Sequence, residues 1–223
     1  MSELMAQGRD AELFAAGPGS VRRRYRDGRD VTAEAEVMRW LHSEGYPVPE
    51  LYDAQGPDLI MTLVEGPTMA ESLLSEQIEP AAAGEMLADL HNRLHALAHP
   101  EARATQCLVH LDLHPLNVLI AASGPVVIDW SNSRLGDPRL DVSMTMVILA
   151  QAATVLPPEL AGIDPAYLRA TLAPLLSAFS QAAAHDPAPA LDQAAELRRR
   201  DPHLSTAERS GLDAAMTWAS TLL

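Results

Sequence analysis

The chain has 223 residues, and 48% of them are hydrophobic, so it is long enough to fold around a sizeable core. The formal net charge of −14 argues against a nucleic-acid partner, because phosphate groups favour a basic protein face, and it fits a cationic small molecule better. All 16 basic residues are arginine, which excludes every mechanism that needs a lysine amine.

The chain carries no sign of export or of membrane insertion. Cys107 is the only cysteine, so we expect no disulfide within the chain and a reducing compartment. The first twelve residues contain acids and lack the apolar core of a signal peptide. The longest apolar run, 144–156, is shorter than the roughly 20 residues that a membrane-spanning helix needs. These observations predict a cytoplasmic protein without a membrane partner, and they leave the oligomeric state unknown.

The first third of the chain has mainly strand patterns. In chain order, the expected elements are two strands joined by a turn within 11–26, a helix over 32–45, and strands at 50–54 and 58–64. The two-residue period of a strand places Val21, Arg23 and Tyr25 on one face. Gly45 and Pro47 end the helix.

The rest of the chain has mainly helical patterns. Helices are expected over 79–98, 141–155, 165–184, 191–200 and 205–222, the last beginning with a Ser-x-x-Glu capping box. The exception is a hairpin at 117–129. We therefore predict an α+β fold, with a small sheet-rich lobe over 1–66, a hinge at about 61–67 and a larger helical lobe over 67–223.

The hairpin at 117–129 brings two oxygen-bearing side chains together. A turn centred on Ser123 places Asn117 opposite Asp129. Opposite residues in an antiparallel pair have Cβ atoms about 5 Å apart on one face. Amide and carboxylate oxygens suit Mg²⁺, which needs only one or two protein ligands.

The loop that leads into this hairpin, residues 110–117, has the spacing of a kinase catalytic loop. Asp112 precedes Asn117 by five residues, as in H-x-D-x-x-x-x-N, where the aspartate serves the acceptor hydroxyl and the asparagine binds metal. A metal-dependent hydrolase is an alternative that would use His110, Asp112, His114 and Asp129.

Three further histidines have a spacing that is able to bind zinc. His91, His95 and His99 repeat every four residues on one predicted helix. The neighbouring Leu94 and Leu97 mark that helix as a packing element, so we interpret the three histidines as residues of the core edge or surface.

Three motifs together resemble the aminoglycoside phosphotransferase and choline kinase family, small-molecule kinases with a protein-kinase-like fold. They are HLDLHPLNVLI at 110–120, VVIDW at 126–130 and GDPRLD at 136–141. The resemblance implies that Asp112 is the catalytic base, that Asn117 and Asp129 hold magnesium, and that His110 braces the loop. It also implies that Asp141 accepts backbone donors at the start of a helix.

The resemblance raises the question of the missing lysine, since a strand lysine held by a helix glutamate normally binds the nucleotide phosphates. We expect Arg23 to replace it, because Arg23 occupies the basic position of related sequences. Glu34 is the expected partner, since it lies on the apolar stripe of its helix, where an unpaired carboxylate is costly. In the hinge, backbone groups near Thr62 and Val64 are expected to recognise adenine.

The sequence thus predicts a kinase that moves the γ-phosphoryl group of ATP or GTP, with Mg²⁺, to a hydroxyl of a small molecule. The acidic composition fits a cationic acceptor. A nucleotide-binding pseudokinase or regulatory module is the alternative favoured by the absent lysine, and a metal-dependent hydrolase is a weaker one.

Overall fold

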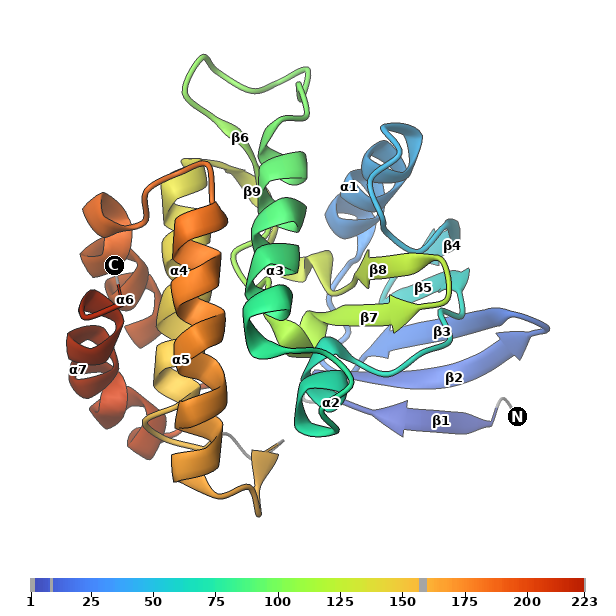
Figure 1. The fold of residues 1–223 in the computed structure, drawn as a ribbon. Helices are drawn as coiled ribbons and strands as arrows, with labels where there is room; N and C mark the ends of the chain where they lie inside the picture. Colours follow the sequence, from blue (N-terminus) through green and yellow to red (C-terminus); the bar gives the residue numbers. More distant parts are fainter. Residues whose placement is uncertain (1–2, 9, 157–159, 223) are drawn as a thin grey trace. The chain divides into compact units, whose positions relative to one another are not determined.

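The computed structural model describes residues 3–8, 10–156 and 160–222, which combine strands and helices in an α+β fold (Figure 1). Two compact units make up the chain. Unit 1 comprises Met1–Thr68 and Asn117–Ser133, and unit 2 comprises Met69–Leu116 and Arg134–Leu223. The hairpin segment thus groups with the N-terminal sheet, whereas the sequence assigned it to the helical lobe.

Unit 1 contains a five-stranded antiparallel sheet with the strand order β1-β2-β3-β5-β4 (Figure 1). Its strands are β1 (Leu4–Gln7), β2 (Ala11–Gly17), β3 (Ser20–Tyr25), β4 (Leu51–Gln55) and β5 (Asp58–Thr62). In β3, Val21 and Tyr25 are buried with Arg23 between them, as the two-residue period predicts. The strand β1 was not predicted.

Helix α1 (Thr32–Ser43) also belongs to unit 1 and contacts β4. Its buried face consists of Glu34, Ala35, Met38 and Leu41, which confirms the predicted apolar stripe. The chain turns at Gly45, whose φ of 74° lies in the left-handed region that favours glycine.

The hairpin of unit 1 pairs β7 (Val118–Ala121) with β8 (Gly124–Val127). The predicted register is wrong by one residue. The closing pair is Ala121 with Gly124, so two residues form the loop, and Val118 pairs with Val127 instead of Ile128. The Ile128 N–H donates to the Asn117 carbonyl oxygen at 3.0 Å, so Asn117 lies opposite Ile128 and not opposite Asp129.

Gly66 lets the segment after β5 approach this hairpin closely. A Cβ atom at Gly66 would lie 2.2 Å from the carbonyl oxygen of Ile120, a distance that no side chain tolerates. The neighbouring Pro67 carbonyl oxygen accepts a hydrogen bond from the Ile120 N–H at 2.8 Å. A glycine is therefore required here for steric reasons.

Unit 2 is mainly helical, as predicted. Its helices are α2 (Met69–Leu74), α3 (Pro80–His95), α4 (Pro138–Ala152), α5 (Pro165–Ala182), α6 (Leu191–Arg199) and α7 (Thr206–Ser220). The capping box at Ser205 and Glu208 is present. Over the described ranges, none of the helices has the length and apolar character needed to cross a membrane.

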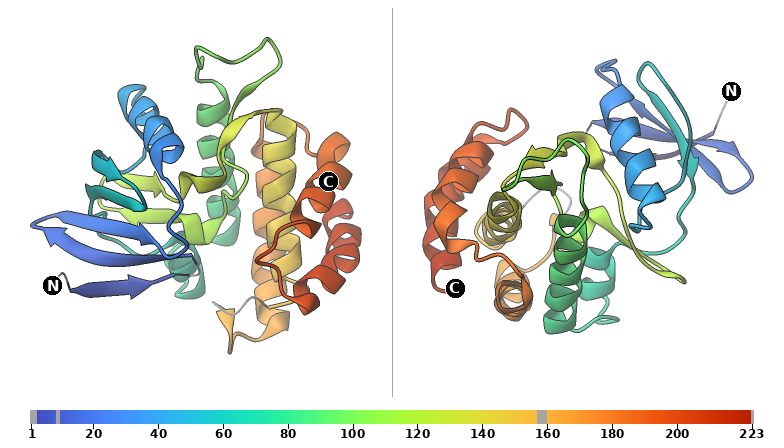
Figure 2. Two further views of the ribbon diagram at one scale, coloured as in Figure 1. Left: turned by 180° about the vertical axis from the view of Figure 1, so that it is seen from behind. Right: turned by 90° about the horizontal axis from the view of Figure 1, so that it is seen from above.

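The core of unit 2 forms where α3, α4 and α5 lie side by side (Figures 1 and 2). Gly84 allows α3 to approach α5, since a Cβ atom there would lie 2.2 Å from the Leu175 carbonyl oxygen. A short sheet of β6 (Cys107–Val109) and β9 (Arg134–Gly136), which the sequence did not predict, completes the unit. Residue 110, where the predicted catalytic loop begins, directly follows β6.

Candidate active site

In unit 1, strand β3 holds Arg23 between two carboxylates. Arg23 Nη1 lies 3.2 Å from Glu34 Oε1, and Nη2 lies 2.7 Å from Asp129 Oδ1. The guanidinium carbon also lies 4.7 Å from the centre of the Tyr25 ring, within cation–π range. The predicted contact between Arg23 and Glu34 is present, and Asp129 is an additional partner that the sequence did not reveal.

Glu34 is the more deeply buried of the two carboxylates. Its Oε2 accepts a hydrogen bond from the Tyr25 hydroxyl at 2.7 Å. Burial raises the pKa of Glu34, and the charge of Asp129 adds to this rise, while Arg23 and Tyr25 oppose it. Burial also lowers the pKa of Arg23, but the charges of Asp129, Tyr25 and Glu34 outweigh burial and raise it. The arginine therefore remains a cation at any physiological pH.

Asp129 and Asn117 carry the oxygens expected to hold magnesium. Asp129 has a φ of 64°, in the left-handed region, and Oδ1 accepts a hydrogen bond from Ser131 Oγ at 2.9 Å. Its side chain is 32% exposed. Asn117 ends the short helix η1 (Pro115–Asn117) and is half-buried. A partly exposed carboxylate and an amide in one unit fit Mg²⁺, which keeps several waters and takes few protein ligands.

The segment expected to recognise adenine follows β5. The Thr62 N–H donates to the Glu50 carbonyl oxygen at 2.9 Å, and Thr62 Oγ1 lies 2.8 Å from the Tyr52 hydroxyl. The N–H of Thr62 is therefore used within unit 1. Val64 lies two residues beyond the strand and is half-buried. Adenine recognition near these residues stays a prediction.

In unit 2, Asp141 of α4 fixes the backbone just before Asp112. Its carboxylate is fully buried and accepts hydrogen bonds from the N–H groups of His110, at 3.0 Å, and Leu111, at 2.6 Å. His95 Nε2, from α3, lies 2.8 Å from Asp141 Oδ2. Burial alone would raise the pKa of Asp141, but the hydrogen bond from His95 and the nearby histidine charges hold it well below its ordinary value.

Two histidines contact Asp112 itself. The Asp112 N–H donates to His110 Nδ1 at 3.2 Å, so the His110 ring is tied to the backbone of the loop. His114 Nε2 lies 3.4 Å from Asp112 Oδ1, and His114 Nδ1 accepts the Leu116 N–H. The Asp112 side chain is 23% exposed. Burial favours its neutral form, but His114, His110 and Arg198 together lower the pKa of Asp112, which is therefore a carboxylate able to accept a proton.

His91 and His95, the two histidines of α3, support the loop, whereas His99 lies beyond the end of this helix. His91 is fully buried, its Nδ1 donates to the Leu87 carbonyl oxygen at 2.9 Å, and its Nε2 lies 3.2 Å from Thr145 Oγ1. Burial lowers the pKa of His91 to about 4, so it is neutral at pH 7. The Thr145 hydroxyl in turn donates to the Leu113 carbonyl oxygen at 2.7 Å. Within the described ranges, no three His, Cys, Asp or Glu residues gather closely enough to hold a metal ion.

Sequence reasoning missed the contact between His95 and Asp141. The four-residue spacing of His91 and His95 and the neighbouring leucines indicated residues of the core edge or surface, which is wrong for His91, because its side chain is fully buried. The side chain of His95 is 1% exposed, and it lies against a carboxylate 46 residues later in the chain. The GDPRLD motif, which contains Asp141, was the sequence signal for this contact, because a buried aspartate needs a hydrogen-bond donor as a partner.

Two family models match the chain. The "Phosphotransferase enzyme family" matches residues 93–185, and the "RIO domain" matches residues 6–137, which is more than half of the chain. Comparison with curated protein sequences finds no match.

Solved structures resemble the whole chain. An aminoglycoside phosphotransferase, APH(2'')-Ib with ADP bound, has a TM-score of 0.58 and 14% identity over 100% of this chain and 92% of its own. The complex of gentamicin with APH(2'')-IIa has a TM-score of 0.61 and 15% identity over 100% and 90%. A choline/ethanolamine kinase family protein from Mesorhizobium loti has a TM-score of 0.55 and 16% identity over 100% and 87%. These likenesses confirm the predicted two-lobed, kinase-like fold.

Proposed function

We propose that this chain moves the γ-phosphoryl group of ATP to a hydroxyl of a small molecule. The chain belongs to the kinase-like phosphotransferases described by the RIO domain and the Phosphotransferase enzyme family. The observation that carries the proposal is the placement of Arg23, a permanent cation paired with Glu34 and Asp129. A kinase needs a cation at this point to bind the nucleotide phosphates, and this lysine-free chain supplies an arginine.

Each polar residue around Arg23 in unit 1 and around Asp112 in unit 2 then has a role. Arg23 binds phosphate oxygens through its planar, forked donors while Glu34 fixes its orientation. Asp112 orients the acceptor hydroxyl and takes its proton, and His110 holds the backbone of Asp112 in place. Asn117 and Asp129 would hold magnesium, which neutralises charge on the transferred phosphoryl group when it is bound.

The similar structures support the choice of nucleotide and the general type of acceptor. One of them was solved with ADP and another with gentamicin. GTP remains an alternative donor, because no feature of the segment around Thr62 and Val64 selects between the two bases. The match to the RIO domain names no small-molecule acceptor, so the acceptor class is itself part of the proposal.

The test is an ATP-consumption screen over aminoglycosides, macrolides, choline-like amines, amino sugars, nucleosides and hydroxy acids. We expect Asp112→Asn to lower kcat by about 10²- to 10⁴-fold while ATP binding survives, since the variant loses only the proton acceptor. Asp129→Ala should abolish magnesium-dependent activity. Asp89→Asn, at a side chain of α3 that is 64% exposed, is the control and should behave as wild type.

Two outcomes would refute the proposal. If wild type binds ATP with Mg²⁺ but consumes none with any acceptor, the chain is a nucleotide-binding pseudokinase. If ATP consumption is equal in wild type and Asp129→Ala, the activity belongs to a contaminant or to another site.

A further inference from the structure

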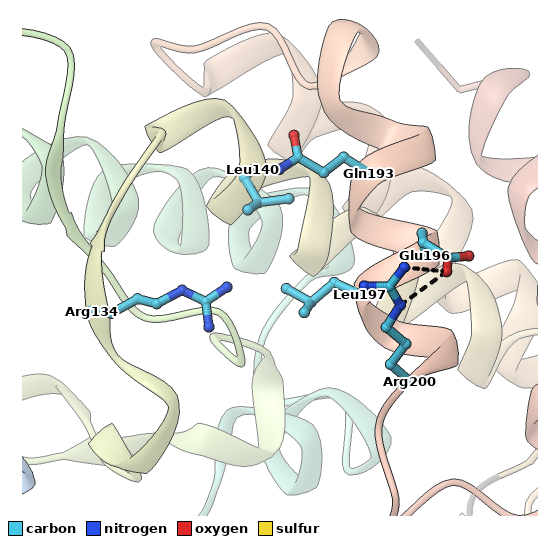
Figure 3. A pocket seen from close by; sticks show the side chains of 6 residues that line it. All are labelled: Arg134, Leu140, Gln193, Glu196, Leu197 and Arg200. Carbon is cyan, nitrogen blue, oxygen red and sulfur yellow. Dashed lines mark hydrogen bonds and ion pairs between the residues drawn. The ribbon is translucent and has the colours of Figure 1, made fainter.

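Unit 2 contains a cavity of about 280 Å³ between β9, the first turn of α4 and the helix α6 (Figure 3). Its volume lies just below the range of about 300–1,000 Å³ that is typical of small-molecule sites, so only a small compound fits. Six residues line it: Arg134, Leu140, Gln193, Glu196, Leu197 and Arg200. We call this cavity the α6 pocket.

Arg134 is the charged group of the α6 pocket whose side chain has no partner. Its backbone pairs with Val109 in the short sheet, and its guanidinium extends from β9 toward Leu197 (Figure 3). Across the part of the chain that the structure describes, no hydrogen bond or ion pair involves this guanidinium. The pocket therefore offers five N–H donors in a fork that matches a carboxylate or phosphate group.

The other two charges of the α6 pocket neutralise each other. Arg200 Nε donates to Glu196 Oε1 at 3.0 Å, as the dashed lines of Figure 3 show, and Arg199 Nη1 also donates to Glu196, at 3.0 Å. Glu196 is thus already satisfied, and the pocket keeps at least one uncompensated positive charge, that of Arg134. Leu140 and Leu197 add apolar surface beside it.

The α6 pocket lies in the same unit as Asp112 and shares neighbouring residues with it. Val109, the strand partner of Arg134, precedes Asp112 by three residues. Arg198, which follows the pocket residue Leu197 in α6, is one of the charges that lower the pKa of Asp112. Strand β6 and helix α6 therefore connect the pocket with the residue that would accept the hydroxyl proton.

We propose that the α6 pocket binds the acceptor and selects small hydroxyl compounds that carry an oxyanion, either a carboxylate or a phosphate; this rests on the proposed phosphotransferase function. Arg134 pairs with the oxyanion, and the acceptor hydroxyl points to Asp112. The inference replaces the cationic acceptor suggested by the net charge of −14. Local charge decides recognition, because charges on the distant surface are screened within about 10 Å.

The first test measures binding, which does not depend on turnover. D-glycerate and glycerol 3-phosphate are titrated calorimetrically into the protein with a non-hydrolysable ATP analogue and Mg²⁺, beside glycerol as the neutral probe and choline as the cationic probe. We expect at least one anionic probe to bind more tightly than glycerol or choline. The two anionic probes separate a carboxylate site from a phosphate site.

Substitutions then assign this binding to the pocket. Arg134→Gln should weaken anion binding by about 10- to 100-fold, which is the change in affinity expected when a hydrogen bond to a charged group is lost. Arg134→Lys should restore part of this affinity. Arg103→Gln, which removes an exposed arginine of unit 2 outside the pocket, should leave binding unchanged. Far-UV circular dichroism of each variant verifies that it is folded.

The outcomes separate this inference from the proposed function. Phosphate transfer to choline or an aminoglycoside that Arg134→Gln leaves unchanged would overturn the inference and keep the kinase. Anion binding that depends on Arg134 without ATP consumption would overturn the kinase and keep the anion site. If neither anionic probe binds more tightly than glycerol, or if Arg134→Gln does not weaken anion binding, the proposal that the α6 pocket binds an oxyanion is wrong.

Discussion

Each unit contains a buried carboxylate that contacts the candidate functional residues of that unit, and the pKa values of the two shift in opposite directions. Glu34 of unit 1 has a raised pKa, whereas Asp141 of unit 2 has a lowered one. Both lose hydration through burial. They differ in their partners, since Glu34 shares Arg23 with a second carboxylate, Asp129, while Asp141 receives two backbone N–H groups and a histidine.

The comparison shows that the buried Asp141 carboxylate is held as an anion first by its hydrogen bond from His95 and by the neighbouring histidines, with backbone N–H groups adding to them, whereas Glu34 relies on one shared cation. An N–H group of the backbone is held by the fold and costs no side-chain entropy to place. Arg23 must divide its positive charge between two acids and a ring. The contacts of Asp141, which include fixed backbone donors, form the rigid half of this comparison, and the contacts of Arg23 form its charged half.

Asp141→Asn tests the rigid half and should have the largest effect. The amide replaces one acceptor oxygen with a donor that faces either the N–H group of His110 or that of Leu111, since the two bind different oxygens. We expect the free energy of unfolding to fall by about 3–5 kcal/mol, as for a broken buried pair. Urea unfolding followed by circular dichroism measures it.

The matched control for Asp141→Asn is Asp137→Asn, four residues earlier at the N-cap of the same helix. Asparagine caps a helix about as well as aspartate, so this variant should be close to wild type. A loss below about 1 kcal/mol for Asp141→Asn would contradict the importance that we assign to the contacts of Asp141.

Arg23→Gln tests the charged half and should have a smaller effect on stability. It leaves Glu34 and Asp129 without their shared cation, but the Asp129 side chain is 32% exposed and water takes over part of its solvation. We expect a loss of about 1–3 kcal/mol in the same unfolding assay. Arg24→Gln, the neighbour whose ion pair with Asp58 is largely exposed, serves as the control and should change stability little. Equal losses in the two variants would argue against a special role for Arg23.

The pH dependence of stability should show the smallest of the three effects, with opposite signs in the two halves. The lowered pKa of Asp141 means that the unfolded state binds more protons near the ordinary value of 3.8, so the contribution of Asp141 to stability is lost as pH falls below this value. The raised pKa of Glu34 means that the folded state binds more protons, so Glu34 reduces stability as pH rises above its ordinary value of 4.5.

The measurement compares wild type with Asp141→Asn and with Glu34→Gln by urea unfolding between about pH 3 and pH 7. The stability difference between wild type and Asp141→Asn should increase with pH, and that between wild type and Glu34→Gln should decrease. Parallel slopes would show that the two carboxylates are in similar environments.

The sequence predicts the residues that repeat with a regular period. Arg23 and Glu34 were paired correctly, because the two-residue period of a strand and the apolar stripe of a helix each fix one side chain. The helices of unit 2 other than α2 were found for the same reason, to within a few residues at their ends.

Contacts that depend on single backbone angles or on long-range pairing were not predictable. The hairpin register failed because Ser123-Gly124-Pro125 permits turns that differ by one residue, and a one-residue slip changes every pairing. The left-handed φ of Asp129, which accompanies its contact with Arg23, has no sequence signal, because an aspartate adopts it only in context. The strands β6 and β9 have three residues each, too few for a recognisable period.

The proposed replacement of a lysine by Arg23 would also change how the site reacts with chemical reagents. A guanidinium that stays protonated has no free electron pair for acylation, so nucleotide probes that label kinases by acylating the phosphate-binding lysine have no target in this lysine-free chain. Reagents that condense with guanidinium groups, such as vicinal dicarbonyls, are the corresponding choice. Bound nucleotide that shields Arg23 would slow this reaction. The rate of Arg23 modification would therefore measure how much of the protein has nucleotide bound.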